Sequence, residues 1–100
     1  MHKINVFVPD SRANVTDVRQ KLDTLRWMAG GQTAAKVEGS WIGERGLEVE
    51  PVTIVSFLIE DNSTKLEIFR AHVNHLAEIL KANGEECVLI EEFEVNARFV

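Results

Sequence analysis

The sequence predicts an α+β protein of the ferredoxin-like class, with β-α-β-β-α-β order, a four-stranded antiparallel sheet and two helices on one face. Two long amphipathic helical patterns are separated by a glycine-rich segment that predicts two strands. β-branched runs lie near both ends of the chain, where the first and last strands are needed. A chain of 100 residues forms one small domain, so we expect residues 1–100 to fold as a single unit.

The N-terminal third predicts a strand followed by a helix. A β-branched run at residues 4–8 ends at the turn-forming pair Pro9-Asp10. We expect Asn14 or Thr16 to cap the helix and Gly30 to end it, because glycine adopts the left-handed conformation at low cost. Apolar residues recur between these limits on one helical face, at Val15, Val18, Leu22, Leu25 and Ala29.

The middle of the chain predicts a hairpin, with strands at residues 36–42 and 47–59 and a turn at 43–46. Residues 52–59 are apolar at both alternating positions, whereas a strand in a half-exposed sheet should alternate. One set, Val55, Phe57 and Ile59, is expected to face the helices. The other set, Val52, Ile54 and Leu58, then lies on the open face and needs cover. A second copy of the chain could supply this cover, so we expect a homodimer through the open sheet face, although residues 95–100 could also cover part of it.

The C-terminal third predicts a second helix and a last strand. Thr64 and Glu67 have the spacing of a capping box, and Asn83-Gly84 ends the helix. The last strand is expected at residues 87–93, with 95–100 as a continuation. Cys87, the only cysteine, is expected to be a small buried residue at the start of this strand. The second predicted helix presents an apolar stripe, formed by Leu66, Phe69, Val73, Leu76 and Leu80.

Composition and charge narrow the classes of partner. The formal net charge is −5, with 16 acidic and 11 basic side chains. Binding to nucleic acid or to anionic membranes needs clustered Lys and Arg, so neither partner is expected, whereas a basic protein surface is compatible. No apolar run approaches the roughly 18 residues of a membrane span or forms a signal sequence. We therefore expect a cytoplasmic protein.

Four side chains were considered as contact residues in the helices and hairpin. His72 and His75 lie three apart on one helix, where metal binding with Glu78, acid–base work and a subunit contact are the alternatives. Trp27 falls off the apolar face of its helix, so it either forms a contact surface or packs against the following loop. Trp41 alternates with glycines, which leave room either for its own ring or for a ligand.

Other polar residues carry weaker signals. Gln32 and Thr33 are not required by the turn in which they lie, which makes them candidates for a ligand contact. Glu48 and Glu50 share one side of a strand, but solvated charge is the ordinary outcome at a strand end. The sequence contains no phosphate loop, nucleophile elbow or CxxC pair, so no catalytic residue, cofactor or metal is predicted.

The middle segment resembles a family of small uncharacterised bacterial proteins. These proteins carry a Gly-x-Thr, a Gly-x-Trp, a turn Gly and then a Glu that opens an apolar strand. The similarity continues into a later strand entered through Gly84-Glu85-Glu86-Cys87-Val88, and it covers roughly residues 30–100. The resemblance implies the fold and no activity. The matching residues here are Gly31, Thr33, Gly39, Trp41, Gly46 and Glu50.

Together these features predict a non-enzymatic binding module for a small molecule or a partner protein. Its size and style are also typical of accessory proteins of phages or mobile elements. The alternative is a small enzyme of the dimeric α/β-barrel type, with a pocket near His72, His75 and Trp41. The predicted contact residues are Gln32, Thr33, Trp41, Trp27, His72 and His75.

Overall fold

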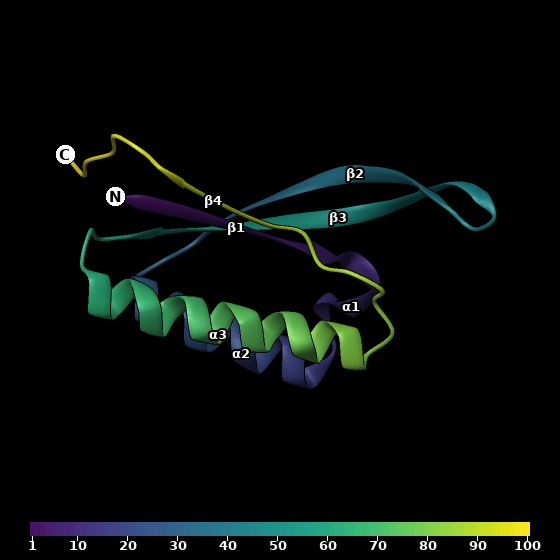
Figure 1. The fold of residues 1–100 in the computed structure, drawn as a ribbon, viewed down its shortest axis with the longest axis horizontal. Coiled ribbons are helices and arrows are strands. Elements are labelled where there is room, and N and C mark those ends of the chain that lie inside the picture. The colour runs from purple at the N-terminus through teal and green to yellow at the C-terminus, as the bar shows by residue number, and fades with distance from the viewer.

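The computed structural model describes all of residues 1–100 and confirms the predicted ferredoxin-like architecture. One antiparallel sheet, in the order β2-β3-β1-β4, forms the first layer, and α2 and α3 form the second against one face of the sheet (Figure 1). The turn expected at Pro9-Asp10 is a short helix, α1, which the sequence did not predict. The elements are β1 (His2–Pro9), α1 (Asp10–Ala13), α2 (Thr16–Ala29), β2 (Thr33–Gly43), β3 (Gly46–Ile59), α3 (Ser63–Ala82) and β4 (Ile90–Glu94).

The hydrophobic core lies between the sheet and the two long helices. It contains 13 buried residues, among them Val55, Phe57 and Ile59, so the predicted inward face of β3 is confirmed. The Phe57 ring meets the Phe69 ring of α3 edge to face, with centroids 5.3 Å apart and planes at 66°. This contact joins the centre of the sheet to the centre of the helix layer. No helix in the structure is both long enough and apolar enough to cross a membrane.

The helix ends differ in part from the prediction. Gly30 ends α2 in the left-handed conformation, with φ 78°, as expected. Neither Asn14 nor Thr16 caps the start of α2, because Val15 occupies the capping position and no side chain accepts a bond there. The Thr64–Glu67 capping box is also wrong. Helix α3 begins earlier, at Ser63, and the Asn62 side chain accepts the hydrogen bond from the Lys65 amide at 3.0 Å.

The predicted last strand is too long at its start. Residues 85–89 precede β4 as coil, tied to β1 by one backbone bond, from the Phe7 amide to the Leu89 carbonyl (3.1 Å). Cys87 therefore lies outside the sheet and is exposed, contrary to the buried position expected for it. Its loop is held instead by an ion pair between Arg12 and Glu85, at 3.2 Å. Residues 95–100 do not continue the strand.

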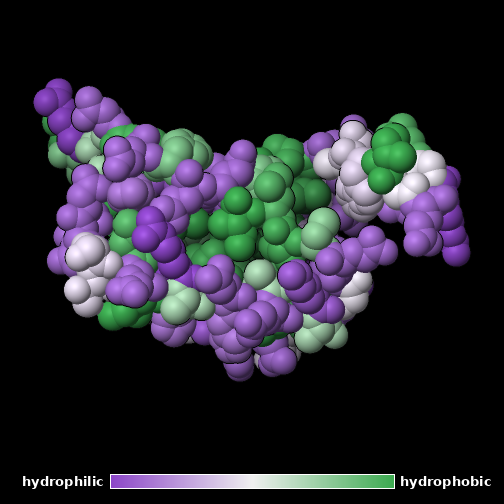
Figure 2. Space-filling model, viewed as in Figure 1, coloured by the Kyte–Doolittle hydropathy of each residue, from purple (hydrophilic) through white to green (hydrophobic).

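Strands β2 and β3 extend beyond the helices as a two-stranded projection, which we call the hairpin arm (residues 39–50) (Figure 1). A two-residue turn between Gly43 and Gly46 closes it, as predicted. Apolar residues are visible on the arm in the space-filling view (Figure 2). They are Trp41, Ile42, Leu47 and Val49, with exposed fractions between 42% and 79%.

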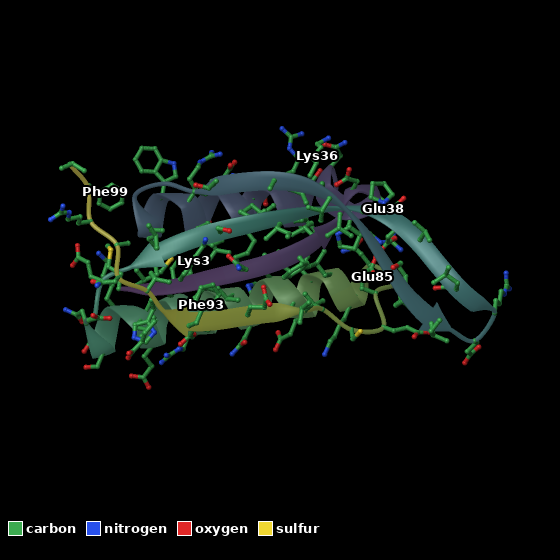
Figure 3. The ribbon with its side chains drawn as sticks, turned by 90° about the horizontal axis from the view of Figure 1, so that it is seen from above. Lys3, Lys36, Glu38, Glu85, Phe93 and Phe99 are labelled. Atoms are coloured by element: carbon green, nitrogen blue, oxygen red, sulfur yellow. The ribbon has the colours of Figure 1, made fainter.

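The sheet face opposite the helices carries a mixture of polar and apolar side chains (Figure 3). Ile54 and Leu58 are half-buried there, and Val52 is buried, with a methyl group against Gly39. The neighbouring strands contribute Lys3, opposite Leu58, and the 43% exposed Phe93, opposite Lys3. The open face expected from the alternation of β3 is therefore present, and no helix covers it.

Candidate ligand pocket

The pocket lies where β3 extends past the start of the adjacent strand, β2. Strand β2 begins at Thr33, opposite Ser56, whereas β3 continues to Ile59. From Phe57 to Ile59, β3 is therefore paired with β1 on one side only. The break occurs because Gly30 and Gly31, with φ of 78° and 155°, turn the chain sharply out of α2 into β2. Backbone groups on the outer edge of β3 are left without a strand partner at this end.

A pocket of about 540 Å³ occupies this place, and we call it the tail pocket. Its size falls in the range of small-molecule sites, roughly 300–1,000 Å³. The loop after α2, the end of β3 and the C-terminal residues supply most of its wall. The lining residues are Met1, Lys3, Ala29, Gly30, Gly31, Gln32, Thr33, Ser56, Leu58, Ile59, Glu60, Lys65, Val95, Ala97 and Phe99.

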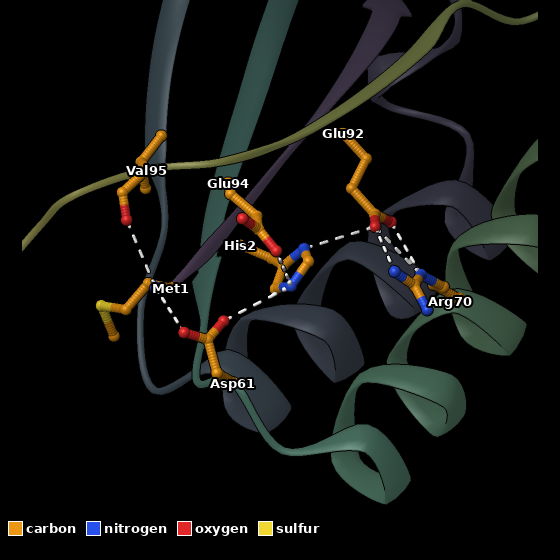
Figure 4. Close-up of polar contacts among 7 residues, drawn as sticks. All are labelled: Met1, His2, Asp61, Arg70, Glu92, Glu94 and Val95. Atoms are coloured by element: carbon orange, nitrogen blue, oxygen red, sulfur yellow. Dashed lines mark hydrogen bonds and ion pairs between the residues drawn. The ribbon is translucent and has the colours of Figure 1, made fainter.

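The C-terminal residues form one side of the tail pocket. Val95, Ala97 and Phe99 line it, whereas the residues between them do not, as expected of an extended chain that presents one face. The segment is attached by the Val95 amide, which donates to the Met1 carbonyl at 2.8 Å. The Met1 nitrogen donates in turn to the Val95 carbonyl (3.3 Å) and to Asp61 (3.1 Å) (Figure 4).

Next to this attachment, His2 lies among carboxylates that face the helix side of the sheet (Figure 4). Its Nε2 is 3.4 Å from Asp61, and its Nδ1 is 3.5 Å from Glu92. Arg70 of α3 binds the same Glu92 and, through this hydrogen bond, lowers the pKa of that carboxyl. These contacts fasten β1, β4 and the start of α3 together at the end of the molecule that holds the tail pocket.

The tail pocket combines hydroxyl, charged and apolar groups. Thr33 and Ser56 offer hydroxyl groups, and Leu58 and Phe99 offer apolar surface. No histidine or cysteine is among the lining residues, so the wall contains no nucleophile paired with a histidine base. The structure places the predicted contact residues Gln32 and Thr33 in this wall.

The two histidines lie elsewhere, on the helix layer. The Lys21 ammonium of α2 donates to His72 Nδ1 at 2.9 Å. Burial, the charge of Lys21 and the neighbouring His75 lower the pKa of His72, which keeps its imidazole neutral at pH 7. His75 is exposed. No group of three histidine, cysteine, aspartate or glutamate side chains is arranged to hold a metal ion.

Neither tryptophan forms a pocket with the two histidines. Trp41 pairs with Glu48 in the hairpin arm, which projects away from α2 and α3 (Figure 1). The pocket that the enzyme alternative required, with Trp41 beside His72 and His75, is therefore not assembled within the chain. Trp27 is 83% exposed, so it does not pack against the following loop.

The glycines beside Trp41 have a different cause from the one proposed. A Cβ at Gly43 would lie 2.8 Å from the carboxyl carbon of Glu48, and one at Gly39 would lie 3.0 Å from a Val52 methyl. These cross-strand side chains fill the space that was assigned to the Trp41 ring. At Gly39 a larger residue would press on the Val52 methyl, whereas at Gly43 the flexible end of Glu48 would have to move aside.

A second cluster of charge lies at the base of the hairpin arm. Burial, followed by the charges of Glu85 and Glu48, raises the pKa of Glu50. Arg12 opposes this shift from α1, and Asp10 adds to it. The like charges of this cluster therefore repel one another more than Arg12 offsets, and the cluster lies at the other end of β3 from the tail pocket.

Several pocket residues escaped the sequence analysis. Lys3 was not predicted, whereas Leu58 was predicted on the open face and residues 95–100 as a segment that could cover it. The sheet register places Lys3 opposite Leu58, and the C-terminal segment outside the sheet adds Phe99. One signal was available, because Val95, Ala97 and Phe99 alternate in the way that an extended segment covering a surface would.

Comparisons with known proteins show the fold. No family model matches the sequence, and no curated protein matches it. CutA1 from Pyrococcus horikoshii is similar over 99% of this chain and 87% of its own, with a TM-score of 0.68 and 13% identity. The GlnK–ATP complex of B. subtilis covers 93% of this chain and 82% of its own, with a TM-score of 0.57 and 13% identity. A phage SAM lyase in complex with S-methyl-5'-thioadenosine is similar over 93% of this chain and 80% of its own, with a TM-score of 0.60 and 19% identity.

Proposed function

We propose that this protein is a non-enzymatic binding module that holds a small organic molecule in the tail pocket. The observation that carries the proposal is the free outer edge of β3 at Phe57–Ile59, which forms part of a pocket of ligand size. A strand edge offers amide donors and carbonyl acceptors at fixed positions, which can recognise a planar polar group. Leu58 and Phe99 add apolar surface around it.

An adenosine group is the ligand chemistry that we propose first. Two proteins with a similar fold are described in complex with ATP or with S-methyl-5'-thioadenosine. Adenine carries an amino donor next to ring nitrogen acceptors, which matches the alternating groups of a strand edge. The hydroxyl of Thr33, at the point where β2 begins, lies in the same wall and supplies one further partner.

We also propose that the protein associates with copies of itself through the hairpin arm and the open sheet face. One face of the arm exposes Ile42, Leu47 and Val49, and the other face exposes Trp41. Apolar groups exposed on both faces of a projecting hairpin favour burial in an interface. The open face and the edge strand β2 offer further surface for pairing. A cytoplasmic location and a phage or mobile-element origin stay predictions from the sequence.

Isothermal titration calorimetry tests the ligand proposal, with ATP and S-methyl-5'-thioadenosine as the probes. We expect saturable binding that Thr33→Val and Phe99→Ala each weaken. The matched controls are Thr64→Val and Phe93→Ala, because neither residue lines the pocket. Binding that all four variants leave unchanged would place the ligand elsewhere, and no binding of either probe would reject the adenosine proposal. Chromatography of the incubated probes detects turnover, which would contradict a purely binding role.

A further inference from the structure

Lys3 is the only one of the five lysines that lines the tail pocket without a counter-charge. Lys36 and Lys65 lie 3.9 Å from Asp10 and Glu60, and Lys21 binds His72. The remaining one, Lys81, has no ion pair but is exposed. Lys3 is half-buried and forms neither an ion pair nor a side-chain hydrogen bond.

The neighbours of Lys3 on the adjacent strands supply no anion. The neighbours opposite it on the two adjacent strands are Leu58 and Phe93, and Lys3 and Phe93 lie side by side on the open face (Figure 3). A lysine packs its stem along apolar surface and keeps its ammonium group accessible, so the charge of Lys3 is open to compensation by an anion. The Met1 nitrogen in the same wall already has this compensation, from Asp61 at 3.1 Å.

We infer that Lys3 is the residue that binds an anionic group of the ligand in the tail pocket. The inference rests on the proposed function for the location of the ligand. It adds that the ligand is negatively charged and that Lys3 binds this charge. The ligand is then a small molecule with a phosphate or carboxylate group. That group sits at Lys3, while the uncharged part of the ligand contacts the free edge of β3 and Thr33. Lys65 and its counter-ion Glu60, 3.9 Å away, also line the pocket, so Lys3 is the lining lysine without a paired carboxylate.

Calorimetric titrations with adenosine, AMP and pyrophosphate separate the two proposals. We expect AMP to bind the wild type about tenfold or more tightly than adenosine, because a hydrogen bond between charged groups is stronger than a neutral one. Lys3→Met should remove this advantage and abolish pyrophosphate binding, and adenosine affinity should stay within about twofold. Lys3→Arg should retain most of the advantage. Lys81→Met, which removes an equally unpaired but exposed lysine, should behave as the wild type.

The outcomes are distinguishable. Equal affinity for adenosine and AMP, or equal losses in Lys3→Met and Lys81→Met, overturns the role of Lys3 and leaves the adenosine proposal standing. Pyrophosphate binding that depends on Lys3, without adenosine binding, supports the anion site and rejects the adenosine proposal. If the wild type binds neither AMP nor pyrophosphate, the inference is wrong. If neither probe binds and Lys3→Met alters the sedimentation coefficient, a second copy of the chain supplies the counter-charge of Lys3.

Discussion

Replacing Phe57 by alanine should destabilise the fold more than almost any other single change. The Phe57 side chain is fully buried in the centre of the core, where its ring meets Phe69 at 5.3 Å. Truncating a buried phenylalanine to alanine costs about 3–5 kcal/mol, from lost burial and the cavity left behind. A domain of this size has roughly 5–15 kcal/mol of stability, so the change removes a large share of it.

Urea denaturation followed by circular dichroism measures the effect. With a slope near 2 kcal/mol per molar, a loss of about 4 kcal/mol lowers the unfolding midpoint by about 2 M. The matched control is Phe99→Ala, the same substitution at a side chain that is 82% exposed, with an expected change of less than about 0.5 kcal/mol. Each variant is measured at two protein concentrations, because self-association would make the midpoint concentration-dependent.

A double-mutant cycle with Phe69→Ala isolates the aromatic contact. An edge-to-face pair contributes about 0.5–1.5 kcal/mol beyond its buried area, so the double variant should lose less than the sum of the two single losses. Additive losses would show that the two rings act independently. If Phe57→Ala and Phe99→Ala had similar effects, the placement of Phe57 at the centre of the core would be wrong.

Three further perturbations address charge and assembly. Burial and neighbouring carboxylates raise the pKa of Glu50 above 4.5, so its charge destabilises the folded state as pH rises through the folded-state pKa. In urea unfolding at a series of pH values, Glu50→Gln should therefore stabilise the protein at pH 7 and lose this advantage below pH 4.5. An advantage of the same size below pH 4.5 would contradict a role for the Glu50 charge. Lys21→Met should raise the pKa of His72 towards 6.5. The rise should be partial because burial, the largest cause of the lowered pKa, remains. NMR titration of the imidazole measures this change, and an unchanged titration would contradict the contact between Lys21 and His72. Ile42→Ser, at a 79% exposed position of the hairpin arm, should weaken self-association in sedimentation velocity without unfolding the chain, and an unchanged sedimentation coefficient would remove the arm from the interface.

The fold could be predicted because its strongest signals are local and periodic. The alternation in β3 assigned Val55, Phe57 and Ile59 to the core, and Gly30 was correctly placed at the end of α2. The errors arose where several residues compete for one role. Asn62, and not Thr64, caps α3, since the helix begins two residues earlier than the capping box required.

The candidate site was predictable only in part, for a different reason. Gln32 and Thr33 were identified because the turn did not account for them, and both line the tail pocket. Lys3 could not be identified from the sequence, because its role depends on having no carboxylate beside it in the folded structure. The two histidines were conspicuous in the sequence, yet His72 contacts Lys21 on the helix layer and has no place in the pocket.

The position of β1 at the middle of the sheet has a consequence for the order of folding. Its two neighbours pair through residues far along the chain, His2 with Ile59 on one side and with Glu94 on the other. During synthesis only the β2–β3 hairpin can form from local contacts, and the sheet cannot be completed until β4 has left the ribosome. Until then the first strand, apolar at Ile4, Val6 and Val8, has no permanent partner on its β4 side. The nascent chain should therefore depend on chaperones most strongly just before β4 emerges.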